Sequence, residues 1–269
     1  MRLAYQTITW GGVVGHPVGV TSVKDLYYMA HGSTEEALRD ISDAGYEGVE
    51  LFEGNLMEYA GREEELRDSL KSLGLELVAV YSGANFIYSE ILQEELSKIE
   101  GVARLAGSLG ASHMVFGGGA VRSTGILDQD YRLLAEGLNQ ATGLVEAAGM
   151  TASYHPHLGS CVESPDQISK LAEQTGINLC PDTGHLKGGG GNPEEFIRTY
   201  ADRIEYVHLK DFVDGGFLPL GHGELDLPRI IRALKEIDYD GWITVELDEY
   251  AGHSKEGACI SREFIEEHW

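Results

Sequence analysis

The chain of 269 residues predicts a single (β/α)8 barrel. One observation is a recurring unit, in which a short β-branched or aromatic run ending in polar residues precedes a segment with helical periodicity. A second is that eight such runs occur, as a barrel of about 250 residues requires. A third is that no linker or composition shift divides residues 1–269, which predicts one domain. The expected strands are Leu3–Ile8, Gly48–Phe52, Glu76–Tyr81, His113–Phe116, Thr151–His155, Ile177–Pro181, Ile204–Leu209 and Trp242–Leu247.

The segments between these strands carry helix start and stop signals. Ser33, with Glu36 three residues later, has the form of a capping box ahead of an apolar periodic run. Pro165 and Pro193 stand where the first turn of a helix tolerates proline. Helix ends are predicted by glycines that each precede the next strand, namely Gly74, Gly110 and Gly149.

A doubly wound parallel sheet is the alternative to a barrel. Such a sheet usually needs fewer strands and carries a GxGxxG motif after the first of them. Here the first expected strand is followed by Trp10-Gly11-Gly12, which lacks that order. The barrel is therefore favoured, and in a barrel the functional side chains gather at the carboxyl ends of the strands.

Composition excludes several classes of partner. The chain has 20 Lys and Arg against 44 Asp and Glu, a formal net charge of −24. No basic surface is expected that would attract nucleic acid or an anionic membrane, and no apolar run is long enough to span a bilayer. The three cysteines have no CxxC spacing, which favours a reducing cytoplasm over a disulfide framework or a zinc knuckle.

Polar residues gather at the ends of the fifth to eighth expected strands. Because these ends meet at one face of a barrel, we expect their side chains to converge. Imidazole and carboxylate groups together suit Mn²⁺ first, with Mg²⁺, Co²⁺ and Zn²⁺ as alternatives. Glu246 is the strongest single candidate, because an unpaired carboxylate in an apolar run is costly to bury. The residues concerned are His155, His157, Asp182, His185, His208, Lys210 and Glu246.

Simpler interpretations exist for these residues. A single histidine beside an apolar strand is more often a hydrogen-bonded core or surface group than a ligand, although four at one barrel face reverse that expectation. Asp182 has the form of a helix N-cap, since Thr183 and Gly184 follow it. Lys210 could be a surface lysine, yet its spacing of two residues from His208 aims both side chains to the same side of a strand.

Seven short motifs run in order along nearly the whole chain, and together they resemble one family. The pattern is similar to that of the xylose isomerase-like barrels, which include sugar phosphate isomerases and epimerases. Within them it most resembles the inosose (2-keto-myo-inositol) dehydratases. The motifs are Ile8-Thr9-Trp10-Gly11, Gly48-Val49-Glu50-Leu51, Tyr154-His155-Pro156-His157-Leu158-Gly159, Asp182-Thr183-Gly184-His185-Leu186, Val207-His208-Leu209-Lys210-Asp211, Gly221-His222-Gly223-Glu224-Leu225-Asp226 and Gly241-Trp242-Ile243-Thr244-Val245-Glu246.

The resemblance implies roles for individual residues. The metal ligands it implies are His155, Asp182, His208 and Glu246. His157 would take a proton from the substrate, with the ordinary histidine pKa of about 6.5. Lys210 would stabilise an enolate or protonate the departing oxygen. The predicted substrate contacts are other strand-end residues, namely Trp10, Glu50, Tyr81 and His185.

The reaction implied is a metal-dependent elimination from a keto-sugar or keto-polyol. Sugar epimerases use two opposed glutamates, whereas here His155 stands in place of one and only Glu246 remains. The alternative enzyme is an isomerase or epimerase with Glu246 and either His155 or His157 as its bases. A sugar-binding barrel without catalysis, or one subunit of a heteromeric complex, is a third interpretation, and a homo-oligomer stays open.

One segment departs from the inosose dehydratase pattern. Only Phe212–Leu220 separates the His-x-Lys-Asp motif from the following Gly-His-Gly, where those enzymes carry a longer insertion. We therefore expect a reshaped substrate pocket. Related subunits of C-glycoside deglycosidases cleave 3-keto-glycosides by a similar elimination, so the leaving group need not be water.

Overall fold

The computed structural model describes residues 1–11 and 27–269, in which eight parallel strands form one sheet. The strands lie in the order β6-β5-β4-β3-β2-β1-β10-β7, so each strand from β1 to β6 pairs with the next along the chain. Their bounds are β1 Arg2–Gln6, β2 Gly48–Phe52, β3 Glu76–Ser82, β4 His113–Gly117, β5 Thr151–His155, β6 Asn178–Leu179, β7 Val207–Leu209 and β10 Trp242–Val245.

The sheet closes on itself between β6 and β7. Two single parallel bridges, Leu179 with Ile204 and Asp182 with His208, join the two edges. The backbone N–H of His208 also donates to the carbonyl oxygen of Pro181 at 3.0 Å. The predicted (β/α)8 barrel is confirmed, and its closing seam passes through two of the predicted metal ligands.

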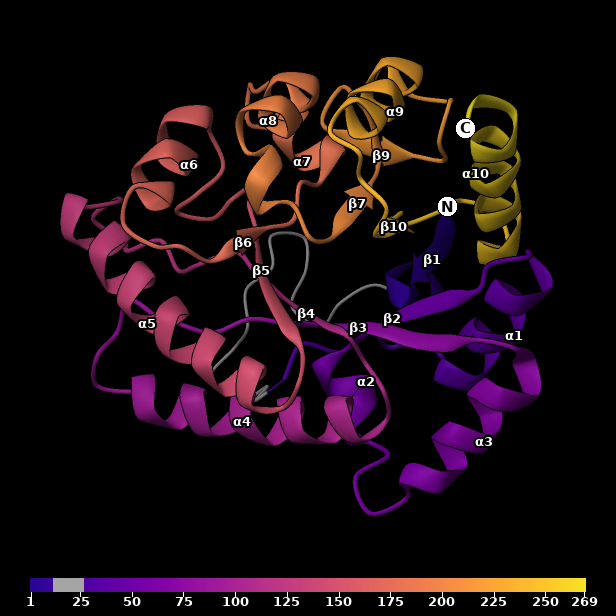
Figure 1. The fold of residues 1–269 in the computed structure, drawn as a ribbon, viewed down its shortest axis with the longest axis horizontal. Helices are drawn as coiled ribbons and strands as arrows, with labels where there is room; N and C mark the ends of the chain where they lie inside the picture. The colour runs from indigo at the N-terminus through magenta and orange to yellow at the C-terminus, as the bar shows by residue number, and fades with distance from the viewer. Residues whose placement is uncertain (12–26) are drawn as a thin grey trace.

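Helices surround the strands (Figure 1). The longest are α4 and α5, which pack against each other beside β3 to β5. The helices are α1 Thr34–Asp43, α2 Glu53–Met57, α3 Glu63–Leu73, α4 Leu92–Ser108, α5 Asp128–Ala147, α6 Pro165–Ala172, α7 Thr183–Gly188, α8 Pro193–Thr199, α9 Leu227–Glu236 and α10 Ser254–His268, with 3-10 turns at Thr7–Trp10 and Ala201–Arg203.

The helix boundaries follow the local signals in the sequence. The Ser33 hydroxyl accepts a hydrogen bond from the Glu36 backbone N–H at 3.2 Å and begins α1. Pro165 and Pro193 occupy the first positions of α6 and α8, as predicted. Gly74 adopts a left-handed conformation, with φ of 68°, at the end of α3. The predicted helix start at Ser33 and the predicted end at Gly74 are confirmed; of the expected capping box, the structure shows the bond to the Ser33 hydroxyl.

Several expected strands are shorter in the structure. The first strand stops at Gln6 rather than Ile8, because the Gln6 side-chain oxygen accepts the Ile8 backbone N–H and turns the chain into a 3-10 turn. The seventh strand begins at Val207 rather than Ile204, since Ile204 makes only a single bridge to β6. The predicted strand ends at Pro181 and Leu247 likewise lie beyond β6 and β10.

A two-stranded antiparallel hairpin was missed in the sequence. It joins β8 Asp211–Val213 to β9 Gly216–Leu218. The turn residues Asp214 and Gly215 both have positive φ, 48° and 84°, which is the two-residue Asp-Gly turn that matches strand twist. This hairpin occupies the shortened segment after Lys210.

The core has two layers. The larger hydrophobic cluster lies between the strands and the helices, where Leu38 and Leu138 contribute from α1 and α5. A smaller cluster, including Ala4, Val115 and Tyr206, fills the interior of the barrel. The interior is polar at the carboxyl ends of the strands, because the residues there include the buried histidines and carboxylates.

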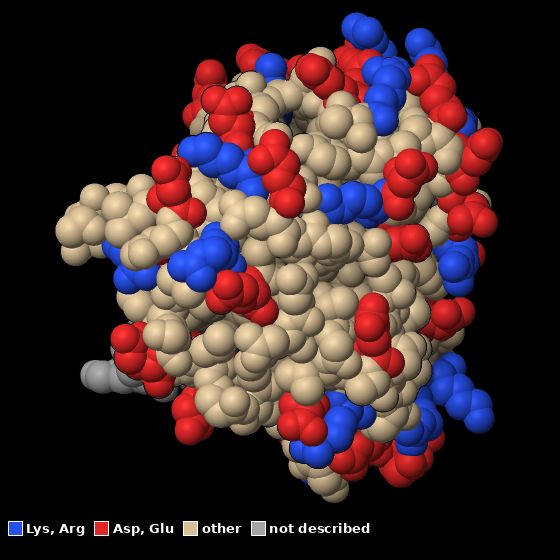
Figure 2. Space-filling view, turned by 60° about the vertical axis from the view of Figure 1, so that its left-hand side comes forward, with Lys and Arg blue, Asp and Glu red and all other residues tan. Residues whose placement is uncertain are grey.

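The surface is acidic and mixed in sign. Figure 2 shows Asp and Glu interspersed with Lys and Arg over one face, without a broad basic patch on it. Among the described residues, no helix is both long and apolar enough to cross a membrane.

Candidate metal centre

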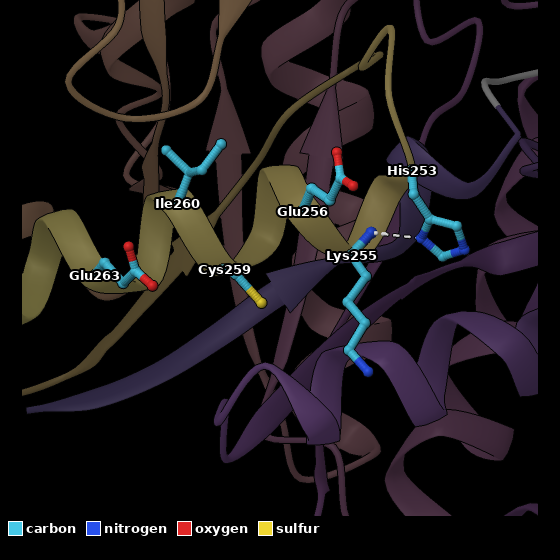
Figure 3. Close-up of a pocket in the computed structure, with 6 residues that line it drawn as sticks. All are labelled: His253, Lys255, Glu256, Cys259, Ile260 and Glu263. Atoms are coloured by element: carbon cyan, nitrogen blue, oxygen red, sulfur yellow. Dashed lines mark hydrogen bonds between the residues drawn. The ribbon is translucent and has the colours of Figure 1, made fainter.

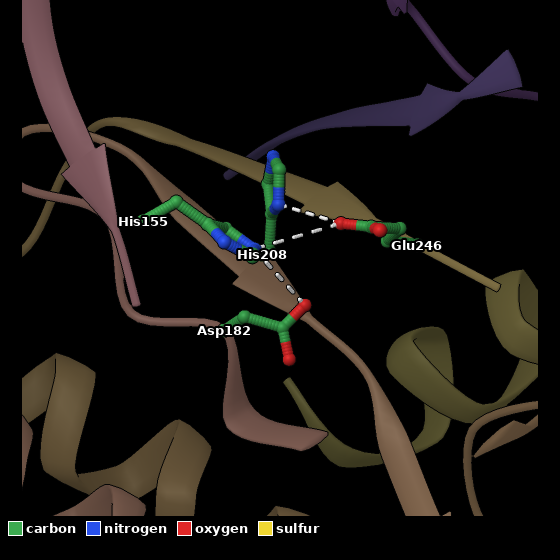
Figure 4. A group of neighbouring side chains, drawn as sticks. All are labelled: His155, Asp182, His208 and Glu246. Atoms are coloured by element: carbon green, nitrogen blue, oxygen red, sulfur yellow. Dashed lines mark ion pairs between the residues drawn. The ribbon is translucent and has the colours of Figure 1, made fainter. Parts of the chain in front are cut away.

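Four side chains from separate strand ends converge inside the barrel. His155 closes β5, Asp182 precedes α7, His208 lies in β7 and Glu246 follows β10. One potential ligand atom from each lies within 4.8 Å of the other three. His155 Nε2 is 3.4 Å from Asp182 Oδ2 and 3.9 Å from Glu246 Oε2, and His208 Nδ1 is 2.6 Å from Glu246 Oε2 (Figure 4). The sequence-based prediction of these four together agrees with their placement.

The four inward-facing atoms fit a divalent cation. Within the described part of the chain, none of them has a hydrogen-bond partner of acceptable geometry. All four side chains are buried. Buried carboxylates are costly unless they are paired, and a cation at the centre would bind all four atoms at once. The atoms are His155 Nε2, Asp182 Oδ2, His208 Nδ1 and Glu246 Oε2.

A second layer of contacts aims these atoms inward. His208 Nε2 lies 2.9 Å from Glu50 Oε2, so the imidazole presents Nδ1 to the cluster. Asp182 Oδ1 accepts the His185 backbone N–H at 2.7 Å, which caps α7 and leaves Oδ2 for the cluster. Glu246 Oε1 accepts from Lys210 Nζ at 3.0 Å and leaves Oε2. Asp182 is therefore both the N-cap of the simpler interpretation and a member of the cluster.

The electrostatics of the cluster favour cation binding. Burial disfavours the charged imidazole of His208, but the carboxylates of Glu50 and Glu246 outweigh it and raise its pKa to about 10. Burial also works against the Glu246 carboxylate, yet Lys210 and His208 hold its pKa well below the usual range. A proton therefore occupies His208 where a metal ion would bind, and binding would release it.

Lys210 lies beside the cluster among three carboxylates. Its Nζ is 3.0 Å from Glu246 Oε1 and 3.9 Å from Asp182 Oδ2, and it forms an ion pair with Asp248. It also lies 3.3 Å from His185 Nε2. Burial opposes its charge, but these carboxylates raise the pKa of the ammonium above its usual value. Lys210 is therefore a protonated donor, and Asp248 is a neighbour that sequence reasoning did not assign.

His157 presents a free nitrogen near the cluster. Its Nδ1 lies 2.7 Å from the Leu158 carbonyl oxygen, so Nδ1 carries the hydrogen and Nε2 is an acceptor. Its ring lies 5.7 Å from that of His155 and 3.9 Å from that of His185. Burial, and then the neighbouring His155 and Lys210, lower its pKa to about 4. The expected value of about 6.5 is wrong for this environment.

The four predicted substrate contacts lie at different places. The Tyr81 ring packs edge-on to the His155 ring, with centroids 5.7 Å apart. Its hydroxyl lies where Gly117 has no side chain, because a Cβ at position 117 would be 1.5 Å from the hydroxyl oxygen. His185 is buried under His157. Trp10 packs on Tyr5 and donates its indole N–H to Asp40 Oδ2 at 2.9 Å.

Glu50, the fourth of them, lies behind His208 rather than in front of it. It is fully buried, and its contact with His208 Nε2 is on the side of the ring away from the cluster. The structure therefore gives it an orienting position. The sequence did not indicate which side of β2 faces His208, because all of Gly48–Phe52 is buried and the strand has no alternation of buried and exposed residues.

A hollow on the surface of the barrel lies apart from the metal centre. It runs along α10 and contains none of the four converging residues. Figure 3 shows the six residues that line it, which are His253, Lys255, Glu256, Cys259, Ile260 and Glu263.

The fold and the converging residues agree with one family. The xylose isomerase-like TIM barrel family matches residues 38–268 of the chain. The chain belongs to this family. The resemblance seen in the sequence motifs is thus confirmed at the level of the family.

Two curated relatives that match most of the chain are inosose dehydratases. The chain is 30% identical over 273 aligned positions to an inosose dehydratase of Geobacillus kaustophilus, covering 88% of this chain and 87% of that protein. It is 28% identical to an inosose dehydratase of Clostridium beijerinckii, covering 93% and 95% of the two chains. The chain therefore spans nearly the full length of these relatives.

Solved structures share the fold at lower identity. The IolI protein, described with a bound zinc atom, superimposes with a TM-score of 0.78 at 17% identity, over 100% of this chain and 99% of that one. The probable 3-DHS dehydratase AsbF of Bacillus anthracis gives 0.76 at 17% identity, over 99% of both chains. At this identity the likeness establishes the barrel fold alone.

Proposed function

We propose that this barrel is a divalent-metal-dependent carbon–oxygen lyase that acts on a keto-sugar or keto-polyol. The enzyme would remove the proton next to the ketone and eliminate a β leaving group, as an inosose dehydratase or a 3-keto-glycoside-cleaving enzyme does. The observation that carries the proposal is that His157 Nε2 has no hydrogen-bond partner among the described residues, on a ring 5.7 Å from that of the converging residue His155. The names of the full-length relatives support it.

The ion would be held by His155, Asp182, His208 and Glu246, whose inward atoms lie close to one another and have no hydrogen bond of acceptable geometry in the described structure. Mn²⁺ is the ion we propose first, with Mg²⁺, Co²⁺ and Zn²⁺ as alternatives, because the donor set mixes imidazole and carboxylate. The chemistry that such an ion supplies when bound is Lewis acidity, which polarises a ketone and acidifies the adjacent C–H.

His157 would act as the base. Because its pKa is lowered to about 4, the imidazole is neutral throughout the neutral pH range and Nε2 is ready to accept a proton. The hydrogen bond between Nδ1 and the Leu158 carbonyl fixes that tautomer and the direction of the ring. The ring is only partly buried, so the accepted proton can return to solvent.

Lys210 would act as the acid. Its ammonium is held protonated by Asp182, Glu246 and Asp248. The substrate C–H bond breaks with its proton passing to His157 Nε2, and its electron pair forms the carbon–carbon double bond. As that double bond forms, the β carbon–oxygen bond breaks with its electron pair staying on the oxygen, and the departing oxygen takes a proton from Lys210 Nζ. When the leaving group is a hydroxyl, water is the second product.

An isomerase or epimerase is the alternative enzyme, but the contacts favour it less. Both oxygens of Glu246 have other uses, Oε1 with Lys210 and Oε2 in the cluster. His155 is fully buried and also faces the cluster, so of the bases proposed for an epimerase, the described structure leaves His157 alone without a contact to the cluster atoms. One base cannot remove and return a proton on opposite faces of a carbon.

The remaining parts of the proposal concern context. We infer a cytoplasmic protein, because Cys161, Cys180 and Cys259 are all unpaired, as in a reducing compartment. A non-catalytic sugar-binding barrel, a homo-oligomer or a subunit of a heteromeric complex are the competing arrangements. Metal content after dialysis and the mass of the purified assembly separate them.

The experiment is turnover of a panel of inososes, keto-sugars and 3-keto-glycosides with Mn²⁺ in D₂O. The proposal expects a product that is lighter than its substrate by one water or one aglycone. A product that has lost no group and carries deuterium at the α carbon would instead establish an epimerase. Metal-free protein with undiminished turnover would contradict the metal dependence.

A further inference from the structure

The hairpin of β8 and β9 begins directly after Lys210. Its strands pair Asp211 with Leu218 and Phe212 with Phe217. The shortened segment seen in the sequence is therefore an ordered element beside the metal centre rather than a simple deletion.

Asp211 fixes this hairpin to the loop that follows it. The side chain is fully buried, and each oxygen accepts backbone N–H groups. Oδ1 accepts from Phe212 at 2.9 Å and Leu225 at 3.2 Å, and Oδ2 accepts from Gly221 and Gly223, both at 2.9 Å. A carboxylate with four donors is a strong anchor, so the hairpin has a defined position.

The anchored hairpin places the Phe217 ring against the site. The ring centroid lies 4.0 Å from Lys210 Nζ and 4.9 Å from the His185 ring. Gly184 makes the approach possible, because a Cβ there would lie 3.0 Å from the Phe217 ring. The backbone of α7 and the hairpin are thus fitted to each other around this phenylalanine.

Phe217, His185 and His157 form a row of packed rings beside the metal centre, which we call the aromatic wall. His157 and Phe217 both pack on His185, with ring centroids 3.9 Å and 4.9 Å from it. His185 is buried, whereas His157 and Phe217 each keep part of their surface exposed. The exposed parts of the wall are therefore the proposed base and one apolar ring.

The lysine ammonium at this wall is already paired with carboxylates. Lys210 is shared among Asp182, Glu246 and Asp248. In the part of the chain that the structure describes, no other Lys or Arg has a recorded contact with these residues or with Phe217. A substrate beside this wall would therefore contact an apolar surface rather than an unpaired cation.

We propose that Phe217 is a specificity-determining residue that packs against the C–H face of a ring-shaped substrate. The inference rests on the proposed function and adds the shape of the substrate. A cyclitol or pyranose ring presents several C–H groups on one face, and these pack on an aromatic surface away from water. An acyclic ketose of the same size has no fixed apolar face, so it gains less from the ring.

The test compares substrates of different shape in matched variants. We measure kcat and KM of wild type, Phe217→Leu and Phe217→Tyr with a six-membered cyclic keto-polyol and with an acyclic hexulose. Leu218→Ala is the control, because Leu218 is the exposed neighbour of Phe217 on the same strand. Phe217→Leu is expected to raise KM for the cyclic substrate about tenfold, with a small effect on kcat, because one apolar contact discriminates by about 10–200-fold.

The variants also separate packing from a structural role. Phe217→Tyr keeps an aromatic face and is expected to retain the cyclic preference. Equal losses on cyclic and acyclic substrates, or a fall in kcat at constant KM, would show instead that Phe217 only supports Lys210, and would overturn the inference.

A binding measurement separates this inference from the proposed function. Calorimetry of Mn²⁺-loaded protein with myo-inositol, a cyclic polyol without the ketone, needs no turnover. Weaker binding to Phe217→Leu with an inactive wild type would support the inference and contradict the lyase proposal. Normal turnover with unchanged KM in Phe217→Leu would do the reverse. A wild type that neither binds the polyol nor turns over any substrate overturns both.

Discussion

Glu50 Oε2 lies 2.9 Å from His208 Nε2, on the side of the imidazole that faces away from Glu246. This contact joins β2 to β7 across the interior of the barrel. It leaves His208 Nδ1 as the nitrogen that points to the metal centre. Glu50 therefore acts on a metal ion through the orientation and basicity of a ligand rather than by direct contact.

We expect Glu50→Gln to weaken metal affinity about 10–100-fold without abolishing the fold. The amide keeps a hydrogen-bond acceptor for His208 Nε2 but loses the charge that favours it. Competition with a chromogenic chelator measures the affinity. Glu94→Gln, an exposed change on α4, is the matched control. Equal affinity in Glu50→Gln and the control would remove the orienting role.

We expect Glu246→Gln to lose most of the bound metal. In wild type the two carboxylate oxygens serve Lys210 and the cluster separately, whereas an amide has a single oxygen and can serve only one of them. Metal content after dialysis, determined by atomic absorption, checks this. Glu249→Gln changes an exposed neighbour and should keep a full complement. A variant at position 246 with wild-type metal content would place the ion elsewhere.

His113, at the start of β4, makes stability depend on pH. Burial, and then Arg2, lower its pKa to about 4, so the folded state favours the neutral ring stacked 4.9 Å from Tyr206. With an unfolded pKa of about 6.5, the stability it contributes is fully present above that pH and is lost as the pH falls toward 4.

The corresponding variants are His113→Gln and His113→Phe, the second of which keeps a ring against Tyr206. Both should flatten the dependence of the free energy of unfolding on pH between 6.5 and 4, by up to about 1.4 kcal/mol per pH unit. Urea unfolding of metal-free protein at several pH values measures the slope. An unchanged slope in both variants would show that His113 is not the titrating group.

We propose that residues 1–269 form one domain, and we expect one cooperative unfolding transition. The barrel closes through contacts between β6 and β7 and through pairing of β1 with β10, so neither half of the chain has a closed sheet alone. Tryptophan fluorescence and far-ultraviolet circular dichroism should give coincident transitions in urea. Limited proteolysis that released two stable halves would contradict this.

The sequence was sufficient for the barrel and for the four converging side chains. Strand ends in a parallel barrel meet at one face, so spacing predicted that a larger set of strand-end residues converges, and the family resemblance singled out His155, Asp182, His208 and Glu246 within it. The strand period of two likewise predicted that His208 and Lys210 share a side. Both inferences depend on local pattern and on the symmetry of the fold.

What the sequence could not supply depends on three-dimensional surroundings. The alternation of side chains along a strand does not show which way Glu50 points, because its strand is buried along its whole length. The pKa of His157 depends on burial and on charges from other strands. Phe217 stands in a segment that only looks shortened, although Asp214 and Gly215 offered a signal for a hairpin.

The measurement that most directly tests the account is turnover of an active keto-sugar or keto-polyol by His157→Asn at saturating Mn²⁺. Asparagine preserves polarity but has no nitrogen that accepts a proton at neutral pH. The account predicts a loss of about 10²–10⁴ in kcat, with metal content unchanged and with full activity in the exposed control His222→Asn. Near-full activity of His157→Asn with the metal in place would contradict it, and would leave another group as the base.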